Sequence, residues 1–67
     1  MKKEIRFAEN LKILRCNAGL SQKQLSEALS VDQRTISAWE KGVCEPSFAT
    51  LALLCEIFNE TFDSILT

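Results

Sequence analysis

Residues 22–41 constrain the fold of this chain most. Their apolar residues recur at helical spacing on both sides of a gap of only a few positions. These apolar residues are Leu25, Ala28 and Leu29 before the gap and Val31, Ile36 and Trp39 after it. The pattern predicts two short helices, joined by a tight turn, that pack on one core. Polar and small residues fill the outward side of the second helix. A helix of that kind can rest on a core and still enter a DNA major groove.

Start and stop signals along the whole chain predict five helices. Favoured helix N-caps are Ser21 (with Gln24 completing a capping box), Asp32, Ser47 and Thr61, and residues that favour helix ends are Gly19, Gly42 and Asn59. The predicted helices cover residues 5–17, 22–29, 33–41, 48–58 and 62–66. No strand-like alternation interrupts them, and 67 residues leave room for one small core. The sequence therefore predicts an all-α, five-helix fold in a single domain, residues 1–67.

Charge is distributed unevenly along the chain. The net charge of −1 argues against binding to a polyanion by charge alone. Residues 1–24 carry six basic and two acidic side chains, whereas residues 25–67 carry two basic and seven acidic ones. This asymmetry suits a protein that meets phosphate groups with one side only, although most charge clusters are simply solvated surface.

The residue types in this chain do not indicate catalysis or metal binding. The chain has no His, and it shows no paired nucleophile and base, no Gly-rich phosphate loop and no acid pair on one helix face. Its three cysteines lack the CxxC spacing of a zinc site. We therefore predict neither an enzyme nor a cofactor, metal or small-molecule site.

Cysteine usage and hydropathy both indicate the compartment. The odd set Cys16, Cys44 and Cys55 excludes complete disulfide pairing and suits a reducing environment. Cys55 falls on an apolar helix face and is interpreted as a small core residue, in preference to a redox switch at Cys16 or Cys44. No apolar run approaches the length of a membrane span, and no signal peptide is visible. These features predict a cytoplasmic protein without a membrane partner.

Several sequence strings in fixed register carry a family resemblance. They are L-x-x-L-R at 11–15, G-L-S-Q at 19–22, L-x-x-A-L at 25–29, T-I-S-x-W-E-K-G at 35–42, P-S at 46–47 and L-x-x-L-C at 51–55. Over roughly residues 11–66 the chain resembles the Cro/repressor type (XRE family) of helix-turn-helix DNA-binding proteins. The resemblance implies a lambda-repressor-like fold, with the helix-turn-helix at about 22–41 and the recognition helix at 33–41.

The resemblance also implies which residues meet DNA. The implied base contacts are Gln33, Arg34, Ser37 and Ala38, and the implied phosphate contacts are Gln22, Lys23, Thr35 and Lys41. Glutamine suits adenine and arginine suits guanine in bidentate geometry, and a helix N-terminus such as that at Gln22 favours an anion. Each position also has a plainer interpretation: Ser37, for example, can be a solvated surface residue, and Lys41 can complement the helix dipole.

The resemblance also gives an expectation for four further positions. Arg15 and Glu40 are expected to form a structural ion pair between the first and third helices, because a charge at the edge of an apolar stripe requires a partner. Ser30 occupies a turn position where the family usually has Gly, so a strained positive φ is expected there. Asp32 is expected to cap its helix well, but also to bring negative charge close to the phosphates.

The predicted function is that of a sequence-specific DNA-binding transcriptional regulator. A repressor that binds an inverted-repeat operator as a homodimer is favoured, with double-stranded DNA as the partner. Candidate residues for the dimer interface are Leu53, Ile57 and Ile65 on the fourth and fifth helices, and Ile13 on the first helix is expected to be a further exposed apolar side chain. The alternative is a protein-interaction module, antitoxin-like or a partner of another regulator, that keeps the fold but binds DNA weakly.

Overall fold

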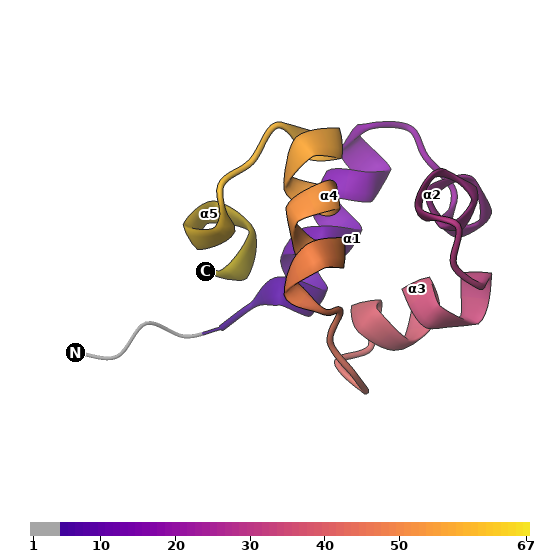
Figure 1. The fold of residues 1–67 in the computed structure, drawn as a ribbon, viewed down its shortest axis with the longest axis horizontal. Coiled ribbons are helices and arrows are strands. Elements are labelled where there is room, and N and C mark those ends of the chain that lie inside the picture. The colour runs from indigo at the N-terminus through magenta and orange to yellow at the C-terminus, as the bar shows by residue number, and fades with distance from the viewer. Residues whose placement is uncertain (1–4) are drawn as a thin grey trace.

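Five helices arranged around one core make up the computed structural model, which describes residues 5–67 (Figure 1). They are α1 (Phe7–Asn17), α2 (Gln22–Leu29), α3 (Gln33–Glu40), α4 (Phe48–Phe58) and α5 (Phe62–Leu66). Within that range no strand is present, so the predicted all-α fold is confirmed. The basic residues Lys2 and Lys3 lie outside the described range.

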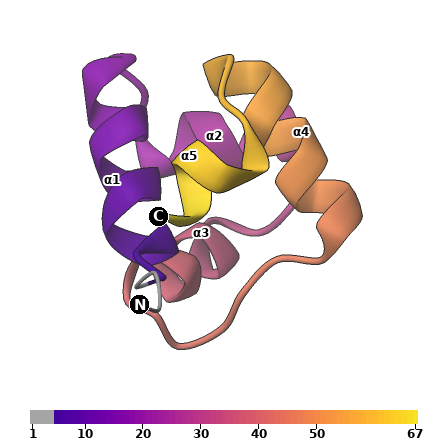
Figure 2. The same cartoon turned by 90° about the vertical axis from the view of Figure 1, so that its left-hand side faces the viewer.

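The arrangement places α2 and α3 on one side of α1 and α4, with α5 on the other side (Figure 1). Seen from the α5 side, α1 and α4 flank α5, and α2 lies behind it (Figure 2). The α5 segment is tied to the start of α1, because the backbone N–H of Arg6 donates to the Leu66 carbonyl at 2.7 Å. None of the helices in residues 5–67 has the length and apolar character that crossing a membrane requires.

Helix starts follow the predicted caps. Ser21 accepts the backbone N–H of Gln24 at 3.0 Å, and the Gln24 side chain accepts the Ser21 N–H at 2.8 Å, which completes the capping box. Asp32, Ser47 and Thr61 each accept a backbone N–H in the first turn of their helices. Such caps satisfy donors that a helix end otherwise leaves unpaired, typically contributing about 1 kcal/mol each.

Two predicted helix ends were wrong by one or two residues. The first helix begins at Phe7 rather than Ile5, since Arg6 offers no side-chain cap and its backbone is engaged with Leu66. The third helix ends at Glu40, and Lys41 is its C-cap. The second difference places Lys41, a candidate phosphate contact, just beyond the end of α3.

Left-handed backbone closes the turns after α2 and α4. Ser30 has φ 58° and ψ 41°, as the departure from Gly predicted, and Asn59 has φ 54° and ψ 48°. A residue with a Cβ adopts this conformation at a cost of about 1–2 kcal/mol, although Asn tolerates it better than most. The turn between α2 and α3 therefore carries backbone strain at Ser30.

The core is formed by one face of each helix. Its buried apolar residues are Phe7, Leu11, Leu25, Leu29, Ile36, Trp39, Leu51, Leu54 and Ile65. Cys55 packs against this cluster, as the sequence predicted, and burial raises the pKa of its thiol. At about 25 cal/mol per Å² of apolar surface removed from water, such burial is the main favourable term for so small a chain.

Ala28, which was expected on an apolar helix face, is exposed. Ala28 and Ser26 flank the Leu25–Leu29 stripe on opposite sides. The turn into α3 covers the Ser26 side, where the Val31 N–H donates to the Ser26 carbonyl at 3.0 Å, and leaves the Ala28 side exposed. The buried Ser26 hydroxyl is satisfied by donating to the Lys23 carbonyl at 2.7 Å.

Ile65 was wrongly predicted at a dimer interface. Its side chain is 0% exposed and belongs to the core. The reason is that α5 folds back onto α1, where the Asn10 side-chain amide donates to the Ile65 carbonyl at 3.0 Å. Ile65 therefore stabilises the domain and is not available to a second copy.

Candidate nucleic-acid interface

The outward side of α3 gathers most of the predicted DNA contacts. Its inward side holds the helix on the core through the buried residues Ile36 and Trp39. On the outward side lie two adjoining hollows. One, of about 440 Å³, is lined by Gln22, Asp32, Gln33, Arg34 and Ser37. The other, of about 300 Å³, is lined by Arg34, Ser37, Ala38, Lys41 and Val43.

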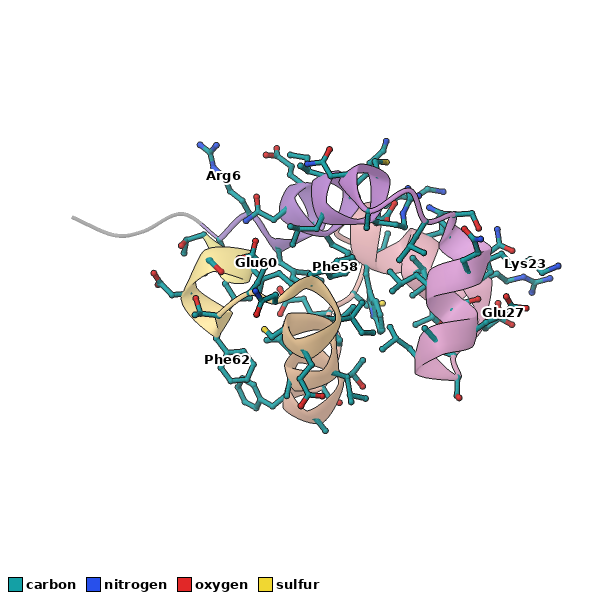
Figure 3. The ribbon with its side chains drawn as sticks, turned by 90° about the horizontal axis from the view of Figure 1, so that it is seen from above. Arg6, Lys23, Glu27, Phe58, Glu60 and Phe62 are labelled. Carbon is teal, nitrogen blue, oxygen red and sulfur yellow. The ribbon has the colours of Figure 1, made fainter. Side chains whose placement is uncertain are left out.

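Because the two hollows share Arg34 and Ser37, they form one continuous face, which we call the reading surface. All four predicted base contacts line it, and so do two of the four predicted phosphate contacts, Gln22 and Lys41. Lys23 and Thr35 do not line it. Lys23 lies on the exposed side of α2 and points outward from the molecule (Figure 3), whereas Thr35 is half-buried.

Asp32 adds a carboxylate to the reading surface. One carboxylate oxygen, Oδ1, accepts the Arg34 backbone N–H at 2.8 Å, so the side chain is held at the start of α3. The position favours helix formation, because an anion there complements the helix dipole. The same carboxylate lies among the residues predicted to meet DNA, as the sequence led us to expect.

The ion pair expected between α1 and α3 is present. Arg15 Nε donates to Glu40 Oε2 at 2.6 Å, and Arg15 Nη2 donates to Glu40 Oε1 at 3.1 Å, a bidentate arrangement. Arg15 Nη1 also donates to the Leu20 carbonyl at 2.8 Å. The two charged side chains are only 11% and 4% exposed, so the pair is largely removed from water.

A third side chain joins this pair. Gln22, the first residue of α2, donates from Nε2 to Glu40 Oε1 at 3.1 Å. Glu40 therefore connects α1, α2 and α3 at one carboxylate. The sequence did not suggest this contact, because Gln22 and Glu40 are 18 positions apart and no local spacing relates them.

The network fixes the charge states of both partners. Burial by itself raises the pKa of Glu40, but the hydrogen bonds from Arg15 and Gln22, with the charges of Arg15 and Lys12, lower it by more, so its pKa lies below the ordinary value. The hydrogen bond to Glu40 raises the pKa of Arg15 in spite of burial. Both side chains remain charged across the physiological range.

Val43 is a member of the reading surface that the sequence interpretation missed. It lies in the loop after α3 and is 75% exposed, and it lines the same hollow as Ala38 and Lys41. Its sequence signal was an apolar residue directly after the Gly that ends a helix, which the motif-based interpretation treated only as loop.

Large apolar side chains are also exposed on α4 and α5. Leu53 and Ile57 are one turn apart on α4 and are 47% and 42% exposed, as predicted. Phe62 on α5 is also exposed and points away from α1 (Figure 3). We refer to these three residues as the α4–α5 patch, in which Phe62 takes the place that Ile65 was expected to hold.

Comparisons with known proteins agree with this geometry. The helix-turn-helix family model matches residues 11–65. The chain is 38% identical over 61 residues to the HTH-type transcriptional activator BcrR of Enterococcus faecalis, covering 91% of this chain and 30% of BcrR. It is 33% identical over 55 residues to the uncharacterized HTH-type transcriptional regulator YgzD of Bacillus subtilis (strain 168), covering 82% of this chain and 83% of YgzD.

A solved structure is similar over nearly the whole chain. The crystal structure of a transcriptional regulator from Listeria innocua superimposes with a TM-score of 0.90 at 31% sequence identity, covering 96% of this chain. This chain spans 60% of that regulator, and it spans 30% and 52% of BcrR and of the B. subtilis regulator YqaE. In each case the similarity covers at least 90% of this chain.

Proposed function

This chain belongs to the helix-turn-helix family of transcriptional regulators, and we propose that it binds an inverted-repeat operator as a homodimer, with α3 in the major groove. The observation that carries the proposal is the composition of the reading surface: four predicted base contacts and two predicted phosphate contacts share one continuous face. An apolar inward side holds that face on a rigid core. A recognition helix requires this division of its two sides.

Base recognition is assigned to the outward residues of α3. Gln33 and Arg34, both exposed in the first turn, suit adenine and guanine respectively, since each can form two hydrogen bonds to that base in the major groove. Ser37 is suited to either a donor or an acceptor on a base edge. Ala38 offers a methyl group to thymine.

Phosphate contacts are assigned to the residues around α3. Gln22 has one Nε2 hydrogen directed to Glu40, which leaves the other available to a phosphate near the N-terminus of α2. Lys41 and Lys23 supply positive charge, and Thr35 supplies a hydroxyl. These contacts fix the register of α3 on DNA without reading sequence.

Dimerisation is assigned to the α4–α5 patch. Leu53, Ile57 and Phe62 are large apolar side chains left exposed in the single chain. Covering them in a two-fold interface removes apolar surface from water and presents two recognition helices to DNA. Half-sites one helical turn apart, about 34 Å, are the expected spacing.

The direction of regulation is proposed as repression by occupancy of the operator. A domain whose described surface offers DNA-facing and dimer-forming residues acts most simply by blocking the polymerase. The name of the relative BcrR, a transcriptional activator, makes activation the second candidate. A reporter gene placed under the operator separates the two, because its expression falls under a repressor and rises under an activator.

The proposal is tested by incubating the protein with a randomised DNA pool at two salt concentrations and sequencing the retained DNA. The expected result is an enriched inverted repeat, with affinity that falls steeply as salt rises, by about 0.9 log units per phosphate contact for each tenfold change. The variant Arg34→Ala is expected to fold but to lose the enriched sequence, whereas Glu56→Gln on α4 is expected to retain it.

The net charge of −1 and the exposed α4–α5 patch favour the protein-interaction alternative. It predicts no enrichment even at low salt. A partner held by Leu53 and Ile57 would also bind with little dependence on salt, because apolar contacts release few counterions. The pool experiment therefore separates the two functions by sequence enrichment and by salt response.

A further inference from the structure

The end of α3 is built as a complete Schellman motif. The Gly42 N–H donates to the Trp39 carbonyl at 3.2 Å, and the Val43 N–H donates to the Ala38 carbonyl at 3.0 Å. Gly42 adopts φ +73°, the left-handed conformation that this motif requires. The two hydrogen bonds fix Val43 relative to the last turn of α3, so its side chain is attached to the helix rather than to a loose loop.

Val43 and Ala38 together form an apolar element within a polar face. A Schellman motif is frequently accompanied by apolar contact between these two positions. Here the Val43 side chain is 75% exposed, and both residues line the hollow that also contains Arg34 and Lys41. Helix capping alone does not require an exposed β-branched side chain at this point of the reading surface.

We propose that Val43, fixed beside Ala38, recognises the C5-methyl group of a pyrimidine in the major groove and so extends base reading by one position beyond α3. This proposal rests on the proposed function, since it deepens the specificity of the same surface. The C5-methyl group is the only apolar group that base pairs present in the major groove, and apolar side chains read it by contact. Thymine and 5-methylcytosine both carry that group.

The flanking residues support a base contact over a contact with the sugar–phosphate backbone. Arg34 lies in the same hollow and is assigned to a base edge, whereas Lys41, two residues before Val43, is assigned to a phosphate. Val43 therefore lies where the surface passes from bases to backbone. A side chain that only packs on the backbone would respond to no base substitution, and this difference makes the proposal testable.

The experiment uses the operator obtained from the randomised pool. Each thymine of one half-site is replaced in turn by deoxyuridine, which lacks only the C5-methyl group, and the Kd is measured for the wild type and for Val43→Ala. At one thymine outside the position read by Ala38, the wild type is expected to lose about fourfold in affinity, the value of one buried methyl group. Val43→Ala is expected to bind the thymine operator more weakly and to show no loss with deoxyuridine there.

Two arms and one control complete the design. At the same position, cytosine should weaken wild-type binding and 5-methylcytosine should restore it in part, which distinguishes a thymine reader from a reader of either methylated base. Ile13→Ala removes an exposed apolar side chain of α1, outside the reading surface, and should behave as the wild type does. Thermal unfolding of Val43→Ala should match the wild type, because so exposed a side chain adds little to stability.

Equal deoxyuridine losses in the wild type and in Val43→Ala at every position would overturn the inference and leave the proposed function intact. An operator without thymine beyond the position read by Ala38 would overturn it as well. Absence of any enriched operator would instead contradict the proposed function, and the inference would fall with it.

Discussion

The side chain of Gln22 donates a hydrogen bond to Oε1 of Glu40 at 3.1 Å, so the first residue of α2 is joined to the last residue of α3. The same carboxylate accepts two hydrogen bonds from Arg15 on α1. A residue assigned to phosphate is thus oriented by the group that anchors the recognition helix. If Gln22 contacts a phosphate as proposed, stability and DNA binding are coupled at Glu40, and variants can separate them.

Arg15→Ala is expected to destabilise the domain severely. It leaves the Glu40 carboxylate, 4% exposed, without its charged partner, and breaking a buried pair in this way costs about 3–5 kcal/mol. A domain of this size has roughly 3–10 kcal/mol of total stability. Thermal unfolding by circular dichroism should show a large drop in Tm, with DNA binding lost as a consequence. Lost binding at an unchanged Tm would mean that Arg15 contacts DNA directly.

Arg15→Met combined with Glu40→Leu is the matched test of the coupling. Replacing both charges by apolar groups leaves no unpaired buried ion, so most of the stability lost in Arg15→Ala should return. Gln22 nevertheless loses its acceptor, and operator affinity should stay several-fold below that of the wild type. A double variant that regains both stability and full affinity would show that Glu40 does not position Gln22.

The contribution of Glu40 to the stability of the domain is expected to change with pH only under acidic conditions. Because the pKa of Glu40 is lower in the folded state than its ordinary value of 4.5, its contribution is fully present above about pH 4.5 and is lost as the pH falls through the folded-state pKa. Urea unfolding of the wild type and of Glu40→Gln from pH 7 to pH 3 should show a constant difference in unfolding free energy down to about pH 4.5 and a shrinking one below it. A difference that grows on acidification would contradict this assignment.

Lys41 and Gln22 are expected to differ in their response to salt. Lys41→Ala removes one charge from the phosphate contacts, so the log–log slope of affinity against salt should fall by about 0.9 per half-site. Gln22→Ala removes a neutral donor and should weaken binding at every salt concentration with the slope unchanged. Titrations at several salt concentrations measure both, and an unchanged slope for Lys41→Ala would remove Lys41 from the phosphate contacts.

Leu53→Glu combined with Ile57→Glu is expected to give a folded monomer. Both side chains are exposed in the single chain, so the charges cost little in the fold, but they would be buried and repel one another across a two-fold interface. Sedimentation should report a monomer. Thermal unfolding should give a Tm close to that of the wild-type chain at low concentration. Ile13→Glu, on α1, serves as the control that should remain dimeric, and a double variant that stays dimeric would exclude the α4–α5 patch.

Ser30→Gly is expected to stabilise the domain. Removing the Cβ relieves left-handed strain of about 1–2 kcal/mol, and the greater freedom of Gly in the unfolded chain offsets part of that gain, leaving roughly 0.5–1 kcal/mol. Asn59→Gly, at nearly the same φ, is the control and should gain less, because Asn adopts this conformation more readily. Chemical denaturation of the two variants compares them directly, and a destabilised Ser30→Gly would show that the serine side chain matters there.

Most of the fold was predictable because its signals are local. The caps at Ser21, Asp32, Ser47 and Thr61 and the left-handed ends at Gly19, Ser30 and Asn59 each depend on a few neighbouring residues, and all were found where expected. The start of α1 was misplaced because it lacks a cap, and it is set by the contact of Arg6 with Leu66, far away in the chain.

The errors at the surface have the same physical origin. Ile65 and Ala28 each lie beside an apolar stripe, and the sequence does not tell which side of the stripe another helix will cover. Tertiary packing decided both cases, burying Ile65 under α1 and leaving Ala28 in solvent. The bond from Gln22 to Glu40 and the place of Val43 on the reading surface also depend on how helices meet, which no local pattern encodes.

Ile36 and Trp39 hold α3 on the core, whereas the α3 side chains assigned to bases are not among the buried residues of the domain. Gln33, Arg34 or Ser37 can therefore be substituted in evolution without changes to the core residues that hold α3 in place. After gene duplication, one copy of such a gene can acquire a new operator through a few substitutions on the outward side of α3. The buried residues that determine folding do not have to change with them.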